Sequence, residues 1–226
     1  MAGKNTAIVL AAGQGKRMHS KIQKQFLEIQ GYPVLYYSLR CFQESPLIQD
    51  IILVTGEDAL SYCKEEIVKK YGFTKVSNVI AGGKERYDSV YAGLCACKDC
   101  RYVLIHDGAR PFISERIINE GIKFAEIYGA AAPGVMPKDT IKVKNEKNFS
   151  VDTPNRANLV SIQTPQVFKF DEILECHEKI RYNGEMVTDD TMVVEKYGYS
   201  VYLYDGEYTN IKVTTPEDLI LAERLI

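Results

Sequence analysis

The sequence predicts an α/β fold in which a mostly parallel sheet is flanked by helices. Three observations lead to this prediction. Short apolar runs of strand length alternate with longer segments of helical periodicity. The runs are apolar at nearly every position, as strands are when helices cover both faces of their sheet. Glycine-rich or polar stretches follow several runs, and in such sheets ligands bind beyond the carboxyl ends of the strands.

Each expected element in the first part of the chain has its own signal. Four apolar runs are expected to form strands, at residues 6–12, 50–56, 75–81 and 101–107. Four segments have helical periodicity, at about 33–43, 58–71, 87–97 and 114–128. Ser114 suits the N-cap of the last of these helices, and Gly72 follows the second as a stop signal.

The pattern changes from about residue 136 to 162, where β-branched residues, a polar turn and Pro154 replace helical periodicity. We expect a hairpin-like arm at about 137–160, which carries too few apolar residues for a core of its own. Such an arm is either a solvated flap or a contact to a second subunit, and we favour the contact. The arm therefore predicts a homodimer.

Regular elements resume after the arm. Helical patterns are found at 170–182 and 188–197, and a strand is expected at 199–206. A closing helix begins at Thr215, a good N-cap, with Pro216 at the first helical position. No repeat, low-complexity segment or linker interrupts the chain, so we expect a single domain over residues 1–226.

The composition limits the classes of function. The formal net charge is −2 at pH 7, so no general attraction to nucleic acid or to an anionic membrane is expected. No apolar run approaches the ~20 residues that span a bilayer, and the first residues lack the pattern of a secretory leader. We expect a cytoplasmic protein that holds any anionic ligand with a local cluster of cations.

Three of the six cysteines, Cys95, Cys97 and Cys100, lie close together in the sequence. A structural zinc site needs four ligands from paired short motifs, and no second pair follows at a suitable distance. We interpret these residues as reduced thiols in a reducing compartment.

The stretch LAAGQGKRM, residues 10–18, resembles a phosphate-binding loop of uncertain kind. Glycines behind a strand let backbone N–H groups approach an anion. A dinucleotide fingerprint would need a third glycine where Met18 stands, and a P-loop would need Ser or Thr where Arg17 stands. A plain surface turn is the alternative. The two cations behind the glycines favour a polyphosphate ligand.

Two more motifs follow later strands. In AGGKERYDSVYAGL (81–94), a glycine pair precedes a helix and could approach a base or ribose, with Ser89 as a hydrogen-bonding group. The alternative is a strand-to-helix turn with a polar cap. In LIHDGARPF (104–112), Asp107 and Arg110 stand at the ligand-binding edge. The carboxylate suits Mg²⁺ or sugar hydroxyls, and an internal ion pair with Arg110 is the alternative.

Cations recur along the chain even though its net charge is negative. They lie in apolar or glycine-rich surroundings, at Arg17, Lys24, Arg110, Arg156 and Lys212. Thr164 and Thr188 offer hydroxyl groups in the late motifs QTPQVF and TDD. Together these residues suit a substrate with several phosphates.

The motifs LAAGQGKRM, KQFLEIQGYPVL, GGKERYDSV, HDGARPF, DTIK, QTPQ, TDD and NIKVTTPEDL occur in the order and spacing of one family. From about residue 5 to 226 the chain resembles the 2-C-methyl-D-erythritol 4-phosphate cytidylyltransferases of isoprenoid biosynthesis. The resemblance implies a Rossmann-like nucleotidyltransferase fold with a β-arm that reaches the partner subunit of a homodimer. It also implies the substrates CTP and a sugar-alcohol phosphate, with Mg²⁺ or another divalent cation present.

The resemblance implies roles for individual residues. Arg17 and Lys24 match the cations that stabilise the transition state, and Arg156 and Lys212 match those that position the sugar phosphate. Contacts to the substrates are implied, largely through backbone groups, for Ala11, Ala12, Gly13, Gly15, Gly82, Gly83, Ser89 and Gly108. Side-chain contacts are implied for Asp107, Arg110, Thr140, Thr164 and Thr188, with Thr140 offered across the dimer. Asp107 is also our candidate metal ligand.

The chain departs from the family pattern at Gln23, where Pro is usual before Lys24. Two alternatives to this family remain. Ribitol-5-phosphate cytidylyltransferases share KQFL and NIKVTTP, but typically have Leu-Ala-Gly-Gly in the first loop, whereas this chain has LAAG. A dinucleotide-dependent or non-catalytic nucleotide-binding protein would not need the late cations.

Overall fold

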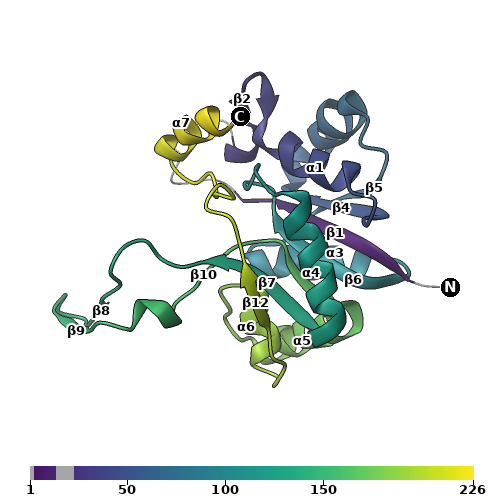
Figure 1. Cartoon of the computed structure of the whole chain (residues 1–226). Coiled ribbons are helices and arrows are strands. Elements are labelled where there is room, and N and C mark those ends of the chain that lie inside the picture. Colours follow the sequence, from purple (N-terminus) through teal and green to yellow (C-terminus); the bar gives the residue numbers. More distant parts are fainter. Residues whose placement is uncertain (1–2, 14–22) are drawn as a thin grey trace.

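The computed structural model of the chain describes residues 3–13 and 23–226. A sheet of eight strands forms its centre, with helices on both faces (Figure 1). The strands are β1 (Lys4–Ala11), β4 (Asp50–Thr55), β5 (Val76–Ala81), β6 (Cys100–Asp107), β7 (Ala130–Val135), β10 (Ser161–Ile162), β11 (Gln166–Lys169) and β12 (Tyr202–Asp205).

The sheet is mostly parallel, which confirms the predicted fold class. Its order is β10-β7-β11-β6-β1-β4-β5, and β12 pairs with β7. Strands β6, β1, β4 and β5 are parallel neighbours, and β12 is parallel to β7. Only the pairings of β11 and β10 are antiparallel within this sheet in the described part of the chain. The four predicted apolar runs are β1, β4, β5 and β6, and their parallel ends meet at one edge.

The helices lie close to their predicted positions. They are α1 (Val34–Glu44), α2 (Leu60–Tyr62), α3 (Arg86–Ala96), α4 (Glu115–Tyr128), α5 (Phe170–Asn183), α6 (Asp190–Glu195) and α7 (Pro216–Leu225). Ser114 caps α4 by accepting a hydrogen bond from the Ile117 backbone N–H, as predicted. The helix expected at 58–71 differs, because α2 is short and continues as the π-helical segment η4 (Cys63–Lys69).

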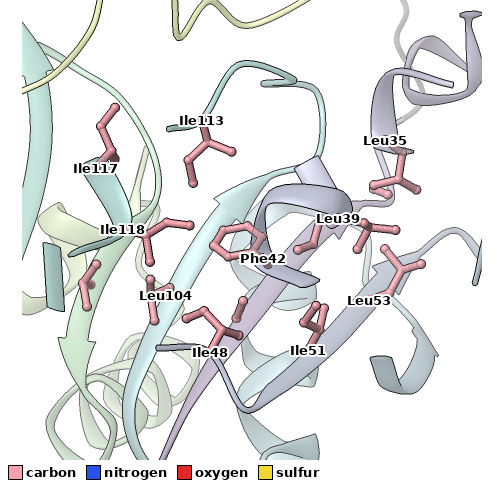
Figure 2. Close-up of a cluster of buried hydrophobic side chains, with 14 of the residues drawn as sticks. Leu35, Leu39, Phe42, Ile48, Ile51, Leu53, Leu104, Ile113, Ile117 and Ile118 are labelled. Carbon is pink, nitrogen blue, oxygen red and sulfur yellow. The ribbon is translucent and has the colours of Figure 1, made fainter. Parts of the chain in front are cut away.

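Alternating side chains of the central strands build two hydrophobic layers. On one face, Val9, Leu53 and Leu104 pack with side chains of α1 and α4. Figure 2 shows part of this cluster, in which Phe42 of α1 lies among isoleucine and leucine side chains. On the other face, residues such as Ile8 pack with side chains of α3, α5 and α6. This two-sided burial explains why the strands are apolar at nearly every position.

A third, smaller cluster supports the two segments that carry Lys24 and Lys212. The hairpin β2 (Glu28–Ile29) and β3 (Tyr32–Pro33) follows the 3-10 helix η2 (Lys24–Phe26). Its Ile29 packs with Val213, which follows Lys212, and with Ala222 of α7. At the start of α7, Asp218 accepts hydrogen bonds from the backbone N–H groups of residues 214 and 215. The cap predicted at Thr215 is therefore confirmed as a capping box.

The segment expected as an arm extends away from the sheet (Figure 1). It contains two short antiparallel strands, β8 (Val143–Lys144) and β9 (Ser150–Asp152), followed by the 3-10 helix η5 (Arg156–Asn158). The Asn145 side chain closes the turn by accepting the backbone N–H groups of residues 147 and 149. The apolar side chains of the arm are exposed to solvent, and the exposed fraction of Phe149 is 69%. The role of this arm in dimerisation stays a prediction.

Across residues 3–13 and 23–226, no helix combines the length and apolar character needed to cross a membrane.

Candidate functional site

A cavity of about 190 Å³ opens at the carboxyl ends of β1 and β6. It is the place at which a doubly wound sheet binds its ligand. Sequence-predicted residues that line it are Ala11, Ala12, Gly13, Lys24, Gly83, Ser89, Asp107 and Lys212. The cavity therefore brings together residues from the first four motifs and the last motif of the chain.

The glycine pair after β5 allows close packing beside this cavity. A Cβ atom at Gly82 would lie 2.5 Å from the Ser89 hydroxyl oxygen and 2.9 Å from the Cβ of Ala12. The Gly83 backbone N–H donates to the Ser89 hydroxyl at 3.2 Å. Any larger side chain at Gly82 would separate the first loop from α3, so the pair keeps two walls of the cavity together.

Gly108 has a comparable steric role beside Asp107. A Cβ atom there would lie 2.9 Å from Leu35 Cδ1 and 3.0 Å from the carbonyl oxygen of Leu10. The Gly108 N–H donates to that same carbonyl at 2.8 Å. Glycine thus lets the end of β6 lie directly against the end of β1.

Asp107 is the centre of an ionic cluster in the cavity. Its Oδ2 atom lies 2.7 Å from Lys212 Nζ and 3.9 Å from Arg110 Nε, while its Oδ1 lies 3.3 Å from Arg86 Nε. Burial alone would raise the pKa of this carboxyl, but Arg86, Lys212 and Arg110 hold the pKa well below its usual range. Asp107 is therefore ionised, and the four side chains together carry a net charge of about +2.

The neighbouring residue, His106, is a neutral histidine that is linked to the Asp107 backbone through Thr164. The Nε2 atom of His106 lies 3.2 Å from the Arg110 carbonyl, which can only accept, so Nε2 carries the proton. The Nδ1 atom then accepts from the Thr164 hydroxyl at 3.0 Å, and that hydroxyl accepts the Asp107 N–H at 3.1 Å. Burial lowers the pKa of His106 to about 4, which agrees with a neutral ring.

Thr164 is thus buried and its hydroxyl is used within the protein. Its predicted contact to a substrate stays a prediction. Arg110 is also largely buried, and its guanidinium donates to the Asn210 carbonyl at 2.7 Å. The Ala109 carbonyl accepts the Val213 N–H at 2.8 Å. These bonds tie the motif HDGARPF to the segment that carries Lys212.

Several predicted site residues lie elsewhere. Gly15 and Arg17 fall outside the residues that the structure describes. Arg156 and Thr140 belong to the exposed arm, where Arg156 donates to the Lys138 carbonyl at 2.8 Å. Thr188 is exposed, and its hydroxyl lies 3.6 Å from Met192 Sδ. These three described residues do not join the cavity of this chain, and their roles stay predictions.

Arg86 lines the cavity, although it is not among the predicted site residues. Its guanidinium lies between Asp107 and Asp190, at 2.7 Å from the Asp190 carboxylate. The signal in the sequence was its place in GGKERYDSV, at the start of a helix behind the glycine pair. Nothing in the local pattern indicates its second partner, which lies 104 positions further along the chain.

The geometry does not fit our prediction that Asp107 ligates a metal. Both of its oxygens face cationic side chains, which repel a divalent ion. Within residues 3–13 and 23–226, no three His, Cys, Asp or Glu side chains are grouped so that they could hold a metal ion.

The described cysteines form no disulfide. The thiols of Cys97 and Cys100 contact backbone carbonyls at 3.4 and 3.3 Å.

Comparison with known proteins places these features in a family. The model of the 2-C-methyl-D-erythritol 4-phosphate cytidylyltransferase family matches residues 5–226. A protein of that name from Clostridium botulinum is 58% identical over 224 residues, covering 99% of this chain and 97% of the relative. One from Clostridium perfringens is 57% identical over 224 residues and covers 99% of both chains.

Solved structures that are similar to this chain belong to enzymes of the same kind as these relatives. The crystal structure of 4-diphosphocytidyl-2C-methyl-D-erythritol synthase from Anaerococcus prevotii has a TM-score of 0.87 at 33% identity, covering 99% of this chain and 96% of that one. The 2-C-methyl-D-erythritol 4-phosphate cytidylyltransferase from Thermus thermophilus has a TM-score of 0.79 at 29% identity, with 96% of both chains covered. The family match and the curated relatives show that this chain belongs to the 2-C-methyl-D-erythritol 4-phosphate cytidylyltransferase family.

Proposed function

We propose that this protein transfers the cytidylyl group of CTP to 2-C-methyl-D-erythritol 4-phosphate. The products are 4-diphosphocytidyl-2-C-methyl-D-erythritol and pyrophosphate, in isoprenoid precursor biosynthesis. Membership of the family supports the activity. Within the structure, the proposal depends on one observation: a glycine-walled cavity at the ends of β1 and β6 that is lined by Lys24, Arg86 and Lys212.

The family match also favours this activity over the two alternatives, a ribitol-5-phosphate cytidylyltransferase and a dinucleotide-dependent or non-catalytic nucleotide-binding protein. The family model and the Clostridium relatives are named for methylerythritol phosphate, which favours this acceptor over ribitol 5-phosphate. The late cation Lys212 lines the cavity together with the first loop, as a triphosphate and a phosphate acceptor require. A dinucleotide-dependent oxidoreductase has no need of that second cationic element.

The reaction requires two anions to approach each other. A phosphate oxygen of the acceptor forms a bond to the α-phosphorus of CTP, and the bond to the bridging oxygen breaks as pyrophosphate leaves. The protein contributes alignment and neutralisation of charge, with no side-chain nucleophile. We assign Lys24, and Arg17 from outside the described residues, to the α-phosphate. We assign Lys212 to the acceptor phosphate.

Asp107 gives Lys212 a fixed place in the cavity. The carboxylate keeps the ammonium group at 2.7 Å, and the hydrogen bond from the Val213 N–H to the Ala109 carbonyl fixes the segment that carries Lys212. A flexible lysine loses conformational entropy when it binds a phosphate, and prior fixation reduces that cost. The position of Lys212 beside an ionised Asp107 therefore supports its predicted role in holding the acceptor.

The divalent cation belongs to the substrate in this proposal. Mg²⁺ prefers few protein ligands and commonly binds through substrate phosphates. Since Asp107 is surrounded by cationic groups, we infer that Mg²⁺ arrives bound to the phosphates of CTP. We expect this reaction of small phosphorylated metabolites to take place in the cytoplasm.

The arm suits a contact to a second subunit. Its exposed apolar side chains include Val143 at 44%, Phe149 at 69% and Val151 at 59%. Exposed apolar side chains gathered on one segment are typical of an interaction surface. We propose that the arm packs on a second copy of the chain and offers Thr140 and Arg156 to the partner's cavity.

A single assay tests the proposed reaction. The protein is incubated with Mg²⁺, CTP and either 2-C-methyl-D-erythritol 4-phosphate or ribitol 5-phosphate, and pyrophosphate release is measured. We expect release that depends on the methylerythritol substrate. Preference for ribitol 5-phosphate would replace the proposed acceptor, and release with neither would contradict a cytidylyltransferase of this kind.

A further inference from the structure

A group of buried charged and polar residues lies behind the cavity and outside the predicted site. Asp190 at the start of α6 is 1% exposed, and His177 of α5 is fully buried. The Nε2 atom of His177 lies 3.3 Å from Asp190 Oδ1, and Arg86 reaches the other oxygen of Asp190 at 2.7 Å. A buried carboxylate is retained at a cost unless its partners are well placed, so this arrangement calls for an explanation.

Arg86 divides its nitrogens between two carboxylates. An arginine beside one carboxylate commonly binds both of its oxygens with two parallel N–H groups. Here one terminal nitrogen goes to Asp190 at 2.7 Å, and only Nε faces Asp107, at the longer distance of 3.3 Å. Arg86 therefore occupies a single oxygen of Asp107. The other oxygen remains for Lys212 at 2.7 Å.

Asp190 itself is held from two sides. His177 approaches one oxygen, as described above. The side-chain carbonyl of Gln166, on β11, accepts the backbone N–H groups of Asp190 and Thr191 at 3.0 and 3.2 Å. The central sheet thus fixes the start of α6, and α6 fixes the direction of Arg86. A chain of contacts leads from His177 through Asp190, Arg86 and Asp107 to Lys212.

We propose that Asp190, supported by His177, is a positioning residue for the transfer reaction: it keeps Arg86 from occupying both oxygens of Asp107 and so leaves one oxygen to hold Lys212. This inference rests on the proposed role of Lys212 at the acceptor phosphate. Neither Asp190 nor His177 contacts the cavity, so their effect passes through Arg86.

The principal test is the variant Asp190→Asn, which keeps the shape of the side chain and removes its charge. Arg86 then has Asp107 as its remaining carboxylate and is expected to bind it through both oxygens, releasing Lys212. Loss of a charge-assisted bond corresponds to a rise on the order of ten- to a hundredfold in the KM for the acceptor. The KM for CTP is expected to change much less. An unchanged acceptor KM would overturn the inference.

Asp189→Asn is the matched control. Asp189 caps α6 by accepting the Met192 N–H at 3.0 Å, and it does not pair with Arg86. This variant loosens the same helix by the same chemical change and is expected to retain the wild-type KM for the acceptor. An equal rise in both variants would assign the effect to the helix alone and refute a positioning role.

A double-mutant cycle with Arg86→Gln separates the proposed path from a general structural effect. If Asp190 acts through Arg86, Asp190→Asn has no further effect on acceptor KM once Arg86 is replaced. Additive effects would contradict the inference. If Asp190→Asn does not fold, His177→Phe replaces it in the cycle, with a smaller rise in the same direction expected and an unchanged KM counting against the inference.

A crystal structure of Asp190→Asn, or of His177→Phe in its place, gives a readout that does not depend on activity. Two-oxygen pairing of Arg86 with Asp107 and a displaced Lys212 are expected. An unaltered contact between Lys212 and Asp107 would overturn the inference even if the wild-type protein proved inactive. An inactive wild type with the expected rearrangement would instead contradict the proposed function alone.

Discussion

At the scale of single residues, the ion pair between Lys212 and Asp107 joins a predicted substrate-binding cation to the end of a central strand. The pair lies at the wall of the cavity, where Asp107 is 11% exposed and Lys212 is 37% exposed. A charge held in this position can act on a phosphate without reorganising when the substrate arrives, which is the general advantage of preorganised electrostatics.

Replacing Lys212 tests this role. We expect Lys212→Ala to reduce turnover by on the order of 10²–10³, because one preorganised charge is lost. Steady-state pyrophosphate release measures the effect, and circular dichroism checks the fold. The matched control is Lys69→Ala, which breaks a surface ion pair with Glu65 at the same distance of 2.7 Å and should leave turnover unchanged. Activity close to that of the wild type in Lys212→Ala would refute its assignment.

His106 makes the free energy of unfolding depend on pH. Burial lowers its pKa from 6.5 to about 4 in the folded chain. Between these values the unfolded chain binds the proton and the folded chain does not, so stability falls as the pH drops. The loss reaches roughly 2 kcal/mol at pH 5 relative to pH 7. Carboxylates with lowered pKa values, such as Asp107, contribute only at more acidic pH.

Urea unfolding at pH 7 and pH 5 measures this effect. We expect His106→Gln to be less stable than the wild type at pH 7 but to lose less free energy between the two pH values. The comparison uses the difference between pH values, so the cost of the substitution itself cancels. Equal losses in both proteins would show that His106 is not the group responsible.

The motifs predicted the residues of the cavity walls, but they could not predict how charges pair. Ser89 follows a glycine pair and Asp107 ends a predicted strand, whereas Lys24 and Lys212 were singled out as cations in KQFL and NIKVTTPEDL, with roles that the family resemblance implies. The pairing of Arg86 with Asp190 depends on how α6 packs on α5 and α5 on α3, across 104 positions of sequence. Local periodicity carries no information on such a contact.

At the scale of elements, strand prediction succeeded where apolar runs were continuous. Strands β1, β4 and β6 fit that description, and together with β5, in which Ser77 and Asn78 interrupt the apolar run, they are four adjacent parallel strands of the sheet. Strands β7 and β11 were not predicted. Small residues and Pro133 weaken the β signal of β7, and β11 has only four residues. Their place is decided by pairing with each other and with β6.

The arm is the element whose role is most directly testable. Its two ends meet in the sheet, because Val135 of β7 pairs with Ser161 of β10. Residues 138–160 can therefore be replaced by a short Gly-Ser linker without separating the paired strands. We expect the resulting chain to sediment as a monomer while the wild type sediments as a dimer, since the exposed apolar side chains of the arm are lost.

The point variant Phe149→Ser provides the control for the deletion. It removes the side chain that is 69% exposed and leaves the hairpin in place, so weakened dimerisation is expected with an unchanged melting temperature of the monomer. A stable dimer of the linker variant would contradict the proposed role of the arm. That result would not affect the description of the fold or of the cavity, which lies within a single chain.

At the scale of the whole molecule, the site depends on segments from both ends of the chain. The first loop follows β1, Asp107 ends β6, and Lys212 precedes α7, yet all three line one cavity. The sheet is continuous from β5 to β10, and the hydrophobic clusters on its two faces share the same central strands. A ligand in this cavity therefore contacts the sheet at the ends of β1 and β6 and, through Lys212, the segment that the small cluster of Ile29, Val213 and Ala222 supports.

This arrangement predicts how CTP changes thermal unfolding. Ligand at a hundred times its Kd stabilises the folded state by about 2.7 kcal/mol. For a chain of 226 residues, this corresponds to a rise in melting temperature of roughly 5–11 °C. Differential scanning calorimetry with Mg²⁺ and CTP should show one cooperative unfolding transition whose melting temperature rises as a whole, as a single domain requires.

ATP at equal concentration is the control. It should raise the melting temperature far less, because the glycine-walled cavity is expected to exclude a purine. Two transitions, of which CTP moves one, would contradict the single domain, and an equal shift with ATP would contradict selection of the cytosine base.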